Sequence, residues 1–213
     1  MSEKLVWDQV QTYAEGLVPS RSTELAAMEA HAKQERFPII GPACGQFCYL
    51  AARMIGARNV FELGSGFGYS TAWFARAVRE NGGGTVHHVV WDQALSRRAK
   101  EHLAKLGVDD QVQFHIGEAV HTLKEQPGPF DLIFNDIDKQ GYPDSLPVIA
   151  SKLRKGGLLI IDNMLWHGQV FDPTDDSPDN GGVREFTRRI TSDPQWIVSL
   201  VPLRDGMIVA MRG

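Results

Sequence analysis

The chain has 213 residues, with 22 Lys and Arg against 26 Asp and Glu, so its formal net charge at neutral pH is -4. This length suits one domain with a complete core, and the interspersed charges argue against a broad nucleic-acid or membrane-binding surface without excluding a local basic patch. There is no apolar leader at the start and no apolar run as long as a membrane span, so we expect a cytoplasmic protein that does not bind membranes.

The N-terminal part, up to about residue 55, is predicted to be a helical extension of the single domain 1–213. Apolar residues recur there at helical spacing. They predict two amphipathic helices, through Trp7, Val10, Tyr13 and Leu17 and through Leu25, Met28 and Ala32. Pro38 and Pro42 interrupt the pattern, and 43–55 returns to helix. Cys44 and Cys48 lie four apart in this helix and are expected to be buried thiols of a reducing compartment rather than metal ligands.

From residue 59 onward, predicted strands alternate with predicted helices, which indicates a parallel sheet covered on both faces. The strands are expected at 60–63, 85–90, 111–116, 130–134, 157–161, 196–201 and 206–211, and the helices at 70–78, 96–106, 119–125, 146–153 and 184–191. A polar loop is expected at 170–183. The last two strands lie too close for a parallel crossover, so they predict an antiparallel hairpin. The expected fold is a doubly wound, Rossmann-like α/β fold with seven strands.

The stretch 59–74, NVFELGSGFGYSTAWF, predicts a strand, a glycine turn and a helix. Gly64, Gly66 and Gly68 alternate, and Tyr69 stands where a dinucleotide-binding turn has its third glycine, so a pyrophosphate is a poor match. Glu62, two residues before the first glycine, favours a cationic ligand rich in hydroxyl and amino groups, and S-adenosylmethionine fits that description. A glycine turn with a purely structural role remains an equal alternative from this stretch alone.

Acidic and amide side chains follow two later strands, at Asp136 and at Asp162 and Asn163. Parallel strands bring their carboxyl ends to one rim, so these oxygen ligands are expected to converge. Two carboxylates and one amide suit Mg²⁺, with Mn²⁺ or Ca²⁺ as alternatives, and leave positions for water or substrate oxygens. Helix caps and turns are the alternative roles for such residues.

Lys139 follows Asp136 by three residues, in a loop that is expected to turn back over the rim. A lysine near a metal and a sulfonium can have its pKa lowered, and can then take a proton from a metal-bound hydroxyl. A solvated loop lysine is the alternative. Trp166 is either a wall for a flat substrate or part of the packing, and the adjacent His167 is expected to lie on the surface.

These residues together resemble the cation-dependent class I O-methyltransferases, the family of catechol and caffeoyl-coenzyme A O-methyltransferases and their bacterial relatives. The resemblance covers nearly the whole chain, through IIGPACGQF, FELGSGFGYST, GEA, FNDIDKQGY, LLIIDNMLWHGQV and VPLRDGMIVAM. The pairing of FNDIDK with IIDNMLWHG is its most specific part.

The resemblance implies roles for individual residues of this chain. Metal ligands are implied at Asp136, Asp162 and Asn163, and a general base at Lys139. The implied cofactor contacts are Ile40, Glu62, Gly64, Gly66, Gly68, Tyr69, Ser70, Glu118, Ala119 and Asp136. The family usually has an acid at the end of the second strand that holds the ribose. This chain has Val90 there, so either Asp92 reaches back or the ribose is held more weakly.

The activity implied by the resemblance is methyl transfer from S-adenosylmethionine to a hydroxyl of a small catechol-like acceptor chelated to Mg²⁺. Methylation of a hydroxylated tRNA base is a second interpretation, for which Arg184, Arg188, Arg189 and Arg204 are candidates for a basic rim. A non-catalytic cofactor-binding domain is a third. Members of the family are often homodimers, and the N-terminal helices are plausible interface material.

Overall fold

The computed structural model describes residues 3–213, and their side chains from Trp7 onward. Its centre is a seven-stranded sheet in the order β3-β2-β1-β4-β5-β7-β6. The strands are β1 (Asn59–Leu63), β2 (Thr85–Val90), β3 (Val112–Ile116), β4 (Phe130–Asn135), β5 (Leu153–Ile161), β6 (Trp196–Val201) and β7 (Met207–Arg212). All neighbours are parallel except β7, which runs antiparallel to β5 and β6. The predicted doubly wound fold with a C-terminal hairpin is therefore confirmed.

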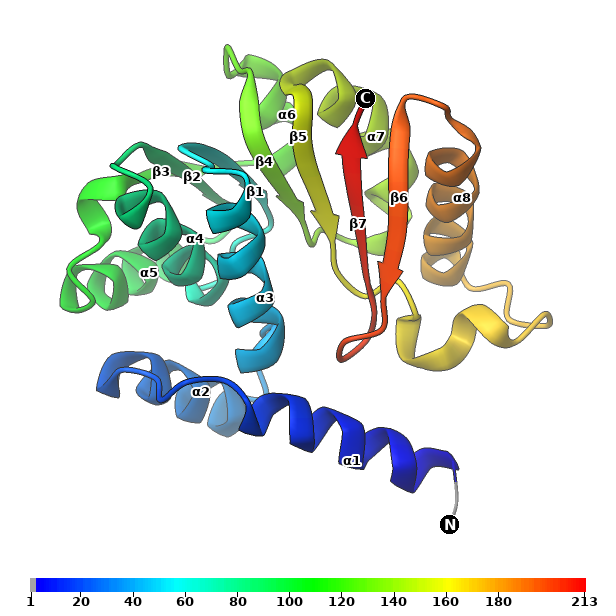
Figure 1. Cartoon of the computed structure of the whole chain (residues 1–213), viewed down its shortest axis with the longest axis horizontal. Helices are drawn as coiled ribbons and strands as arrows, with labels where there is room; N and C mark the ends of the chain where they lie inside the picture. The colour runs from blue at the N-terminus through cyan, green and yellow to red at the C-terminus, as the bar shows by residue number, and fades with distance from the viewer. Residues whose placement is uncertain (1–2) are drawn as a thin grey trace.

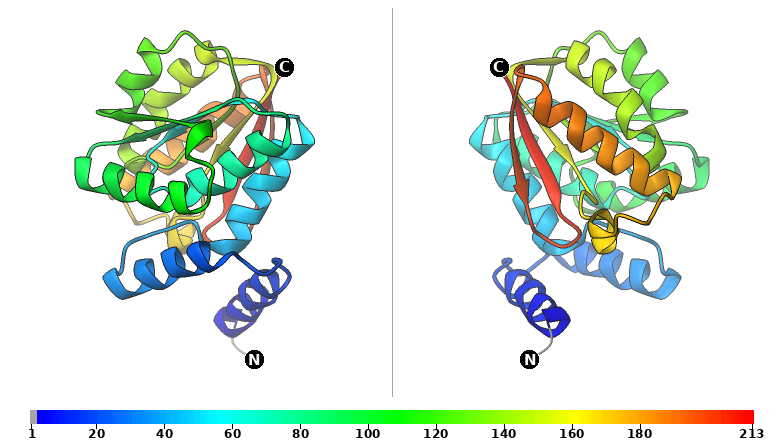
Figure 2. Two further views of the ribbon diagram at one scale, coloured as in Figure 1. Left: turned by 90° about the vertical axis from the view of Figure 1, so that its left-hand side faces the viewer. Right: turned by 90° about the vertical axis from the view of Figure 1, so that its right-hand side faces the viewer.

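Helices cover both faces of this sheet (Figures 1 and 2). The helices of the described residues are α1 (Glu3–Gly16), α2 (Thr23–Glu35), α3 (Gly41–Met54), α4 (Tyr69–Glu80), α5 (Gln93–Lys105), α6 (Ala119–Glu125), α7 (Tyr142–Lys152) and α8 (Pro178–Ser192), with short 3₁₀ turns η1 (Asp109–Gln111), η2 (Lys139–Gly141) and η3 (Trp166–Phe171). Core residues of α3, α4 and α5 pack on one face, and those of α6, α7 and α8 on the other. Within residues 3–213, no helix has the length and apolarity to cross a membrane.

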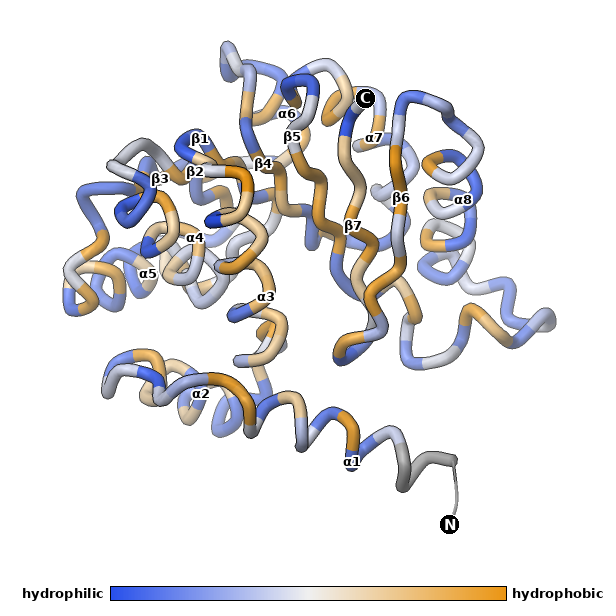
Figure 3. Tube along the Cα trace, in the orientation of Figure 1, coloured by the Kyte–Doolittle hydropathy of each residue, from blue (hydrophilic) through white to orange (hydrophobic). Residues whose placement is uncertain are grey.

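The central strands are apolar on both faces because each face is covered by helices. Along β4, Leu132 and Phe134 pack into the cluster under α3 and α4, while Ile133 packs into the cluster under α6 and α7. Ile160 and Ile161 divide in the same way on β5. Figure 3 shows the resulting hydrophobic colouring along these strands. Because successive side chains of a strand point to opposite faces of the sheet, they alternate between the two cores.

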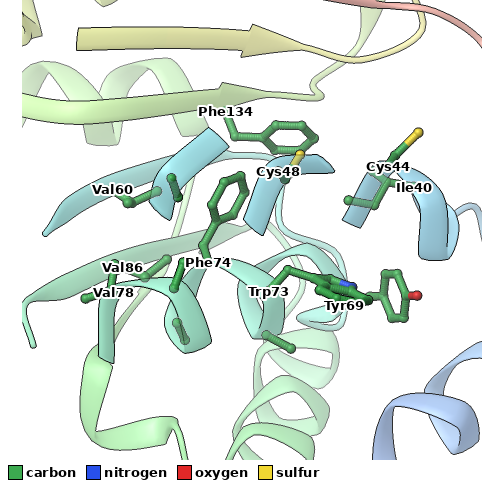
Figure 4. Packing of buried hydrophobic residues seen from close by; sticks show 14 of the residues in the cluster. Ile40, Cys44, Cys48, Val60, Tyr69, Trp73, Phe74, Val78, Val86 and Phe134 are labelled. Atoms are coloured by element: carbon green, nitrogen blue, oxygen red, sulfur yellow. The ribbon is translucent and has the colours of Figure 1, made fainter. Parts of the chain in front are cut away.

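The predicted thiols of α3 lie in the first of these cores. Cys44 and Cys48 are both free and fully buried, and Figure 4 shows them near Ile40 and Phe134. Burial raises the pKa of Cys44 to about 12 and that of Cys48 well above its ordinary value. Both thiols therefore stay protonated and act as small apolar side chains.

The two N-terminal helices differ in how their apolar side chains are placed. On α2, Leu25, Met28 and Ala32 are buried, as predicted. The predicted apolar stripe along α1 instead faces solvent, since Tyr13 is 71% exposed and Leu17, the residue directly after the helix, is 67% exposed. Figure 1 shows α1 extending away from the sheet, beyond the edge at which β4 and β5 end. Amphipathic spacing predicted the helix correctly, but it does not say what covers the apolar face.

The largest boundary differences from the sequence prediction lie around α7 and at the start of α8. The helix expected at 146–153 begins at Tyr142 and ends at Lys152, so that β5 starts at Leu153 rather than at 157. The last helix, α8, begins at Pro178, inside the expected loop 170–183. The glycines near its start are typical of a loop when only the sequence is considered. In the structure a Cβ at Gly182 would lie 2.1 Å from the carbonyl oxygen of Lys139. Close packing of α8 on η2 requires a glycine inside the helix.

A pair of histidines, one buried and one half-buried, lies where β2 and β3 meet. The His87 ring stacks on that of His115, and its Nδ1 is 3.0 Å from His115 Nε2. Phe61 and Phe130 enclose the His87 ring. Burial and the neighbouring His115 lower the pKa of His87 to about 4, and burial also lowers the pKa of His115. Both rings are neutral near pH 7, and protonation favours the unfolded chain.

Replacement of His87 by Gln is expected to flatten the pH dependence of stability between pH 6.5 and about 4. Over this range the histidine is protonated in the unfolded chain but stays neutral in the folded one. The free energy of unfolding of the wild type therefore decreases as pH falls, by up to about 1.4 kcal/mol per pH unit for one such group. Urea unfolding at several pH values measures the difference. The exposed His121→Gln variant is the control, and identical wild-type and His87→Gln profiles would contradict the assignment.

Candidate functional site

A cavity of about 940 Å³ opens at the carboxyl ends of β1, β2, β4 and β5. Such an edge is where doubly wound sheets bind ligands, because the loops that follow neighbouring strands leave a crevice between them. The glycine turn after β1 lines one part of the cavity, and Asp136, Asp162 and Asn163 line another. The two groups singled out from the sequence therefore share one cavity.

The glycine turn is built by very close backbone packing. Gly64 has a φ of 87°, and a Cβ there would lie 2.4 Å from the carbonyl oxygen of Asp136. Gly68 also has a positive φ, and a Cβ there would meet Ala99 of α5 at 2.9 Å. These glycines allow the turn to approach the strand end and the neighbouring helix, which side chains would prevent. Gly66 lines the cavity opposite Phe37, whereas Gly68 packs against α5.

Glu62 lies under the turn and is fully buried. Its Oε2 accepts a hydrogen bond from Thr71 Oγ1, whose oxygen is also 3.0 Å from His88 Nδ1. Its Oε1 has no hydrogen-bond partner among the residues that the structure describes. Burial raises the pKa of Glu62 to about 7, against the opposing effect of its hydrogen bonds. An unpaired buried acceptor is costly. Glu62 is not among the residues that line the cavity or the small pocket beside it, so its contact with a cationic ligand stays a prediction.

The other residues predicted for the donor side of the turn form a small pocket that adjoins the cavity. Ile40, Tyr69 and Ser70 line it together with Gly64 and Asp136. Tyr69 is held in place because its hydroxyl donates to Glu29 Oε1 of α2 at 2.8 Å. Figure 4 shows Ile40 and Tyr69 at the outer end of the first core.

The far end of the cavity lies after β2 and β3. Val90, Glu118 and Ala119 line it, and so does Trp91, whose side chain is 70% exposed. Glu118 also caps α6 by accepting from the backbone N–H groups of Val120 and His121.

Asp92, considered from the sequence as a substitute for the usual acid, caps α5 instead. Its Oδ1 accepts from the backbone N–H groups of Ala94 and Leu95. It is not among the residues that line the cavity. A ribose contact through Asp92 would compete with this cap and stays a prediction.

Asp162 is the more buried of the two carboxylates in the predicted oxygen set, at 1% exposed. Its Oδ2 accepts from Arg204 Nη1 at 3.2 Å, and within residues 3–213 its Oδ1 has no hydrogen-bond partner. Burial and the nearby charge of Asp136 raise the pKa of Asp162, and Arg204 opposes this. An unpaired buried carboxylate oxygen near a second carboxylate is a suitable ligand for a cation.

Asn163 completes the predicted oxygen set. Its backbone adopts a φ of 59°, a conformation that asparagine tolerates better than most residues, and its Nδ2 donates to Asp205 Oδ2 at 3.1 Å. The described residues contain no cluster of three or more His, Cys, Asp or Glu at metal-binding distance. The predicted set has only two carboxylates, because its third member is this amide.

Lys139 lies at the start of η2 and is only 8% exposed. Its Nζ donates to Asp136 Oδ1 at 2.7 Å and to the carbonyl oxygen of Ile137 at 3.1 Å. The same nitrogen lies 5.0 Å from the ring centroid of Tyr142 and 5.8 Å from that of Trp166. Lys139 is therefore a buried amine in the cavity, not a solvated loop lysine.

Comparison with known proteins identifies the family. The model of a family described as O-methyltransferase matches residues 20–213. The chain belongs to this O-methyltransferase family. A protein of Niastella koreensis named catechol O-methyltransferase is 30% identical over 97% of both chains. The resemblance inferred from the sequence is thus confirmed.

Solved structures agree with this family. The O-methyltransferase TomG from Streptomyces achromogenes, in complex with SAM, has a TM-score of 0.87 at 26% identity and covers 100% of this chain and 99% of its own. An O-methyltransferase from Bacillus cereus, in complex with SAH, has the same TM-score at 28% identity and covers 98% of this chain and 99% of its own.

The structure of this O-methyltransferase also brings residues to the cavity that the sequence did not mark for it. Phe37 and Trp91 are cavity-lining aromatics from loops, and Lys124 extends from α6. Arg204, considered for a basic rim, instead pairs with Asp162, and Asp205 lies behind Asn163. The Asp-Gly pair at the hairpin turn was the available signal for Asp205, but only the tertiary structure places that turn beside β5.

Proposed function

We propose that this O-methyltransferase transfers a methyl group from S-adenosylmethionine to a hydroxyl of a small catechol-like acceptor held by a divalent cation. The observation that carries the proposal is the single cavity that joins the glycine turn of β1 to Asp136, Asp162, Asn163 and Lys139. The SAM and SAH complexes of the structural neighbours and the name of the Niastella relative support it.

The donor half would hold the cofactor through the turn and the residues around it. Glu62 lies buried beneath the turn with one unpaired oxygen. Ile40, Tyr69 and Ser70 surround the small adjoining pocket, and Ala119 lies toward the far end of the cavity. The cofactor supplies an electrophilic methyl group on its sulfonium, and a bound cation lowers the pKa of an acceptor hydroxyl. The bare backbone at Gly64 lets the donor approach the acids across the rim.

The acceptor half would hold the cation with Asp136, Asp162 and Asn163, whose oxygens suit Mg²⁺, Mn²⁺ or Ca²⁺. The unpaired Oδ1 of Asp162 is the structural feature that fits this role. Lys139, in its neutral form, would accept the hydroxyl proton at Nζ, beside Asp136. The Trp166 ring close to Lys139 would bound a flat acceptor.

The cation requirement is tested with Asp136→Ala. Methyl transfer from labelled S-adenosylmethionine is measured with catechols, hydroxycinnamoyl esters, flavonoids and bulk tRNA, with Mg²⁺ and with EDTA. Wild-type turnover of a vicinal diol should need the cation, and Asp136→Ala should fall to the level seen with EDTA because a ligand is lost. Asp110→Ala, which removes an exposed carboxylate far from the cavity, should match the wild type.

Full wild-type activity in EDTA would contradict the cation claim. Cofactor binding without transfer to any of these acceptors would favour a non-catalytic domain.

Lys139→Met tests the proton-transfer role. Met keeps much of the apolar stem but cannot take a proton, so kcat should fall about 100-fold or more, while KM for the diol changes little. Lys155→Met, on the exposed amino-terminal part of β5, is the matched control for loss of a lysine. A kcat equal to that of the wild type would exclude Lys139 as the base.

Glu62 makes cofactor affinity depend on pH. With a pKa of about 7, Glu62 is ionised above that value and should then attract the ammonium group of the cofactor; below it, affinity should fall by up to about tenfold per pH unit. His88, whose pKa burial lowers to about 3, stays neutral over this range. Titration of S-adenosylhomocysteine by calorimetry between pH 5.5 and 8.5 measures the effect. Glu62→Gln should bind S-adenosylhomocysteine weakly, and its affinity should change less with pH than that of the wild type. If the affinities of the two proteins change with pH in parallel, Glu62 does not contact the cofactor.

The tRNA interpretation needs free basic groups around the cavity. Arg184 instead donates to backbone carbonyls, including those of Val170 and Asp175, while Arg188 and Arg189 both pair with Glu185. Arg204 pairs with Asp162. The candidate cations are thus engaged within the chain, which favours the small acceptor. Activity on tRNA in the acceptor panel would reverse this preference.

We also propose that the protein is a homodimer in which a second copy covers apolar side chains of α1. The supporting observation is the solvent exposure of its apolar positions Trp7, Val10 and Tyr13, which continues to Leu17 just after the helix. Contiguous apolar surface of this kind commonly marks a protein interface. Sedimentation equilibrium measures the mass in solution, and a monomer at micromolar concentration would contradict the proposal.

A further inference from the structure

The turn between β6 and β7, residues 202–206, reaches the rim of the cavity. It is attached to the segment after β5, since Met164 N–H donates to Gly206 O at 2.9 Å and Leu165 N–H donates to Asp205 O at 2.8 Å. A Cβ at Gly206 would lie 2.5 Å from Leu165 Cγ, so the two segments are packed as closely as a glycine allows. The antiparallel hairpin thus delivers a turn directly behind Asp162 and Asn163.

Asp205 in this turn is only 7% exposed, and both of its carboxylate oxygens are used. Oδ2 accepts from Asn163 Nδ2 at 3.1 Å, and Oδ1 accepts from the backbone N–H of His167 at 2.6 Å. The His167 ring, 69% exposed, has its Nδ1 3.7 Å from Oδ1. The carboxylate therefore joins the two ends of the short segment 163–167.

This segment is strained. Asn163, Trp166 and His167 all have positive φ, at 59°, 44° and 54°, although none is a glycine. Such conformations cost free energy and persist where the surroundings impose them. The two hydrogen bonds to Asp205 hold the segment at its first and last residues. They also decide which way the Asn163 amide points, because only its NH₂ group can donate to a carboxylate.

We infer that Asp205 is a positioning residue, which orients the Asn163 amide so that its oxygen, not its NH₂ group, is offered to a divalent cation. The inference rests on the proposed function, because it needs the cation site. A reversed amide would place two N–H donors toward the cation and would repel it. Groups that support ligands in this way commonly change metal affinity by 10–100-fold when they are lost.

The test is Mn²⁺ binding to the full chain, by calorimetry and by electron paramagnetic resonance, with no cofactor or acceptor present. Asp205→Asn cannot accept from both donors, so its Kd for Mn²⁺ should rise about tenfold. In the double variant Asn163→Asp with Asp205→Asn, the new Asn side chain at 205 can accept from the His167 N–H and donate to the new carboxylate at 163. Both hydrogen bonds are thus restored, and only the one between positions 163 and 205 has donor and acceptor exchanged. The double variant should therefore bind Mn²⁺ at least tenfold more tightly than expected if the effects of the two single substitutions on the binding free energy simply added.

Asp131→Asn is the matched control. Like Asp205, Asp131 accepts from the neighbouring backbone, here the N–H groups of Arg58 and Asn59 at 2.8 Å, and it also pairs with Arg154. It lies at the opposite end of the sheet. Its replacement should lower the melting temperature and leave the Kd for Mn²⁺ unchanged. If Asp205 had only a structural role, Asp205→Asn would likewise lower the melting temperature and leave the Kd for Mn²⁺ unchanged.

The outcomes separate the inference from the proposed function. If the wild type binds Mn²⁺ and Asp205→Asn binds it within twofold of the wild type, or if the double variant is merely additive, the positioning role is wrong and the cation site stands. If the wild type does not bind Mn²⁺ at millimolar concentration, the cation site and the positioning role both fall.

Discussion

The contact between the ends of β1 and β4 is the constraint on which the rest of the site depends. Asp136 N–H donates to Leu63 O at 2.8 Å, and the absence of a side chain at Gly64 lets the segments that follow β1 and β4 pack against each other. The turn that follows β1 belongs to the donor half of the proposed reaction, and Asp136 belongs to the acceptor half. One backbone contact therefore sets the separation of the two halves, and proximity of the reacting groups is a large part of catalysis.

Charge balance is the second organising feature. Asp136 and Asp162 lie close enough to raise the pKa of Asp162, and each is paired with one cation of the chain, Lys139 and Arg204 respectively. These partners come from different parts of the sequence, η2 and the β6–β7 turn. Buried like charges are tolerated when each has such a partner, and the Asp162 oxygen left over is the one that a bound cation would satisfy.

Elements and their order could be predicted from the sequence because the alternating apolar strands and glycine-marked turns are local signals. The beginning of α8 could not, because Gly181 and Gly182 read as loop residues until η2 is packed against them. The apolar stripe on α1 was visible, but its exposure was not, since spacing shows only that a face exists. Among the site residues, Asp92 illustrates a local role that a motif does not reveal, because the carboxylate caps α5.

By itself, the sequence determined the fold class, the family and the set of acids, amide, lysine and glycines that meet at one rim. It could do so because these residues stand directly after strands, and the carboxyl ends of parallel strands share an edge. Only the tertiary structure decided which groups hold those residues in place. Arg204 and Asp205 act on Asp162 and Asn163 across about 40 positions of sequence, through an antiparallel hairpin whose turn happens to reach the same rim. Contacts of that kind depend on how distant segments pack, and no local pattern encodes them.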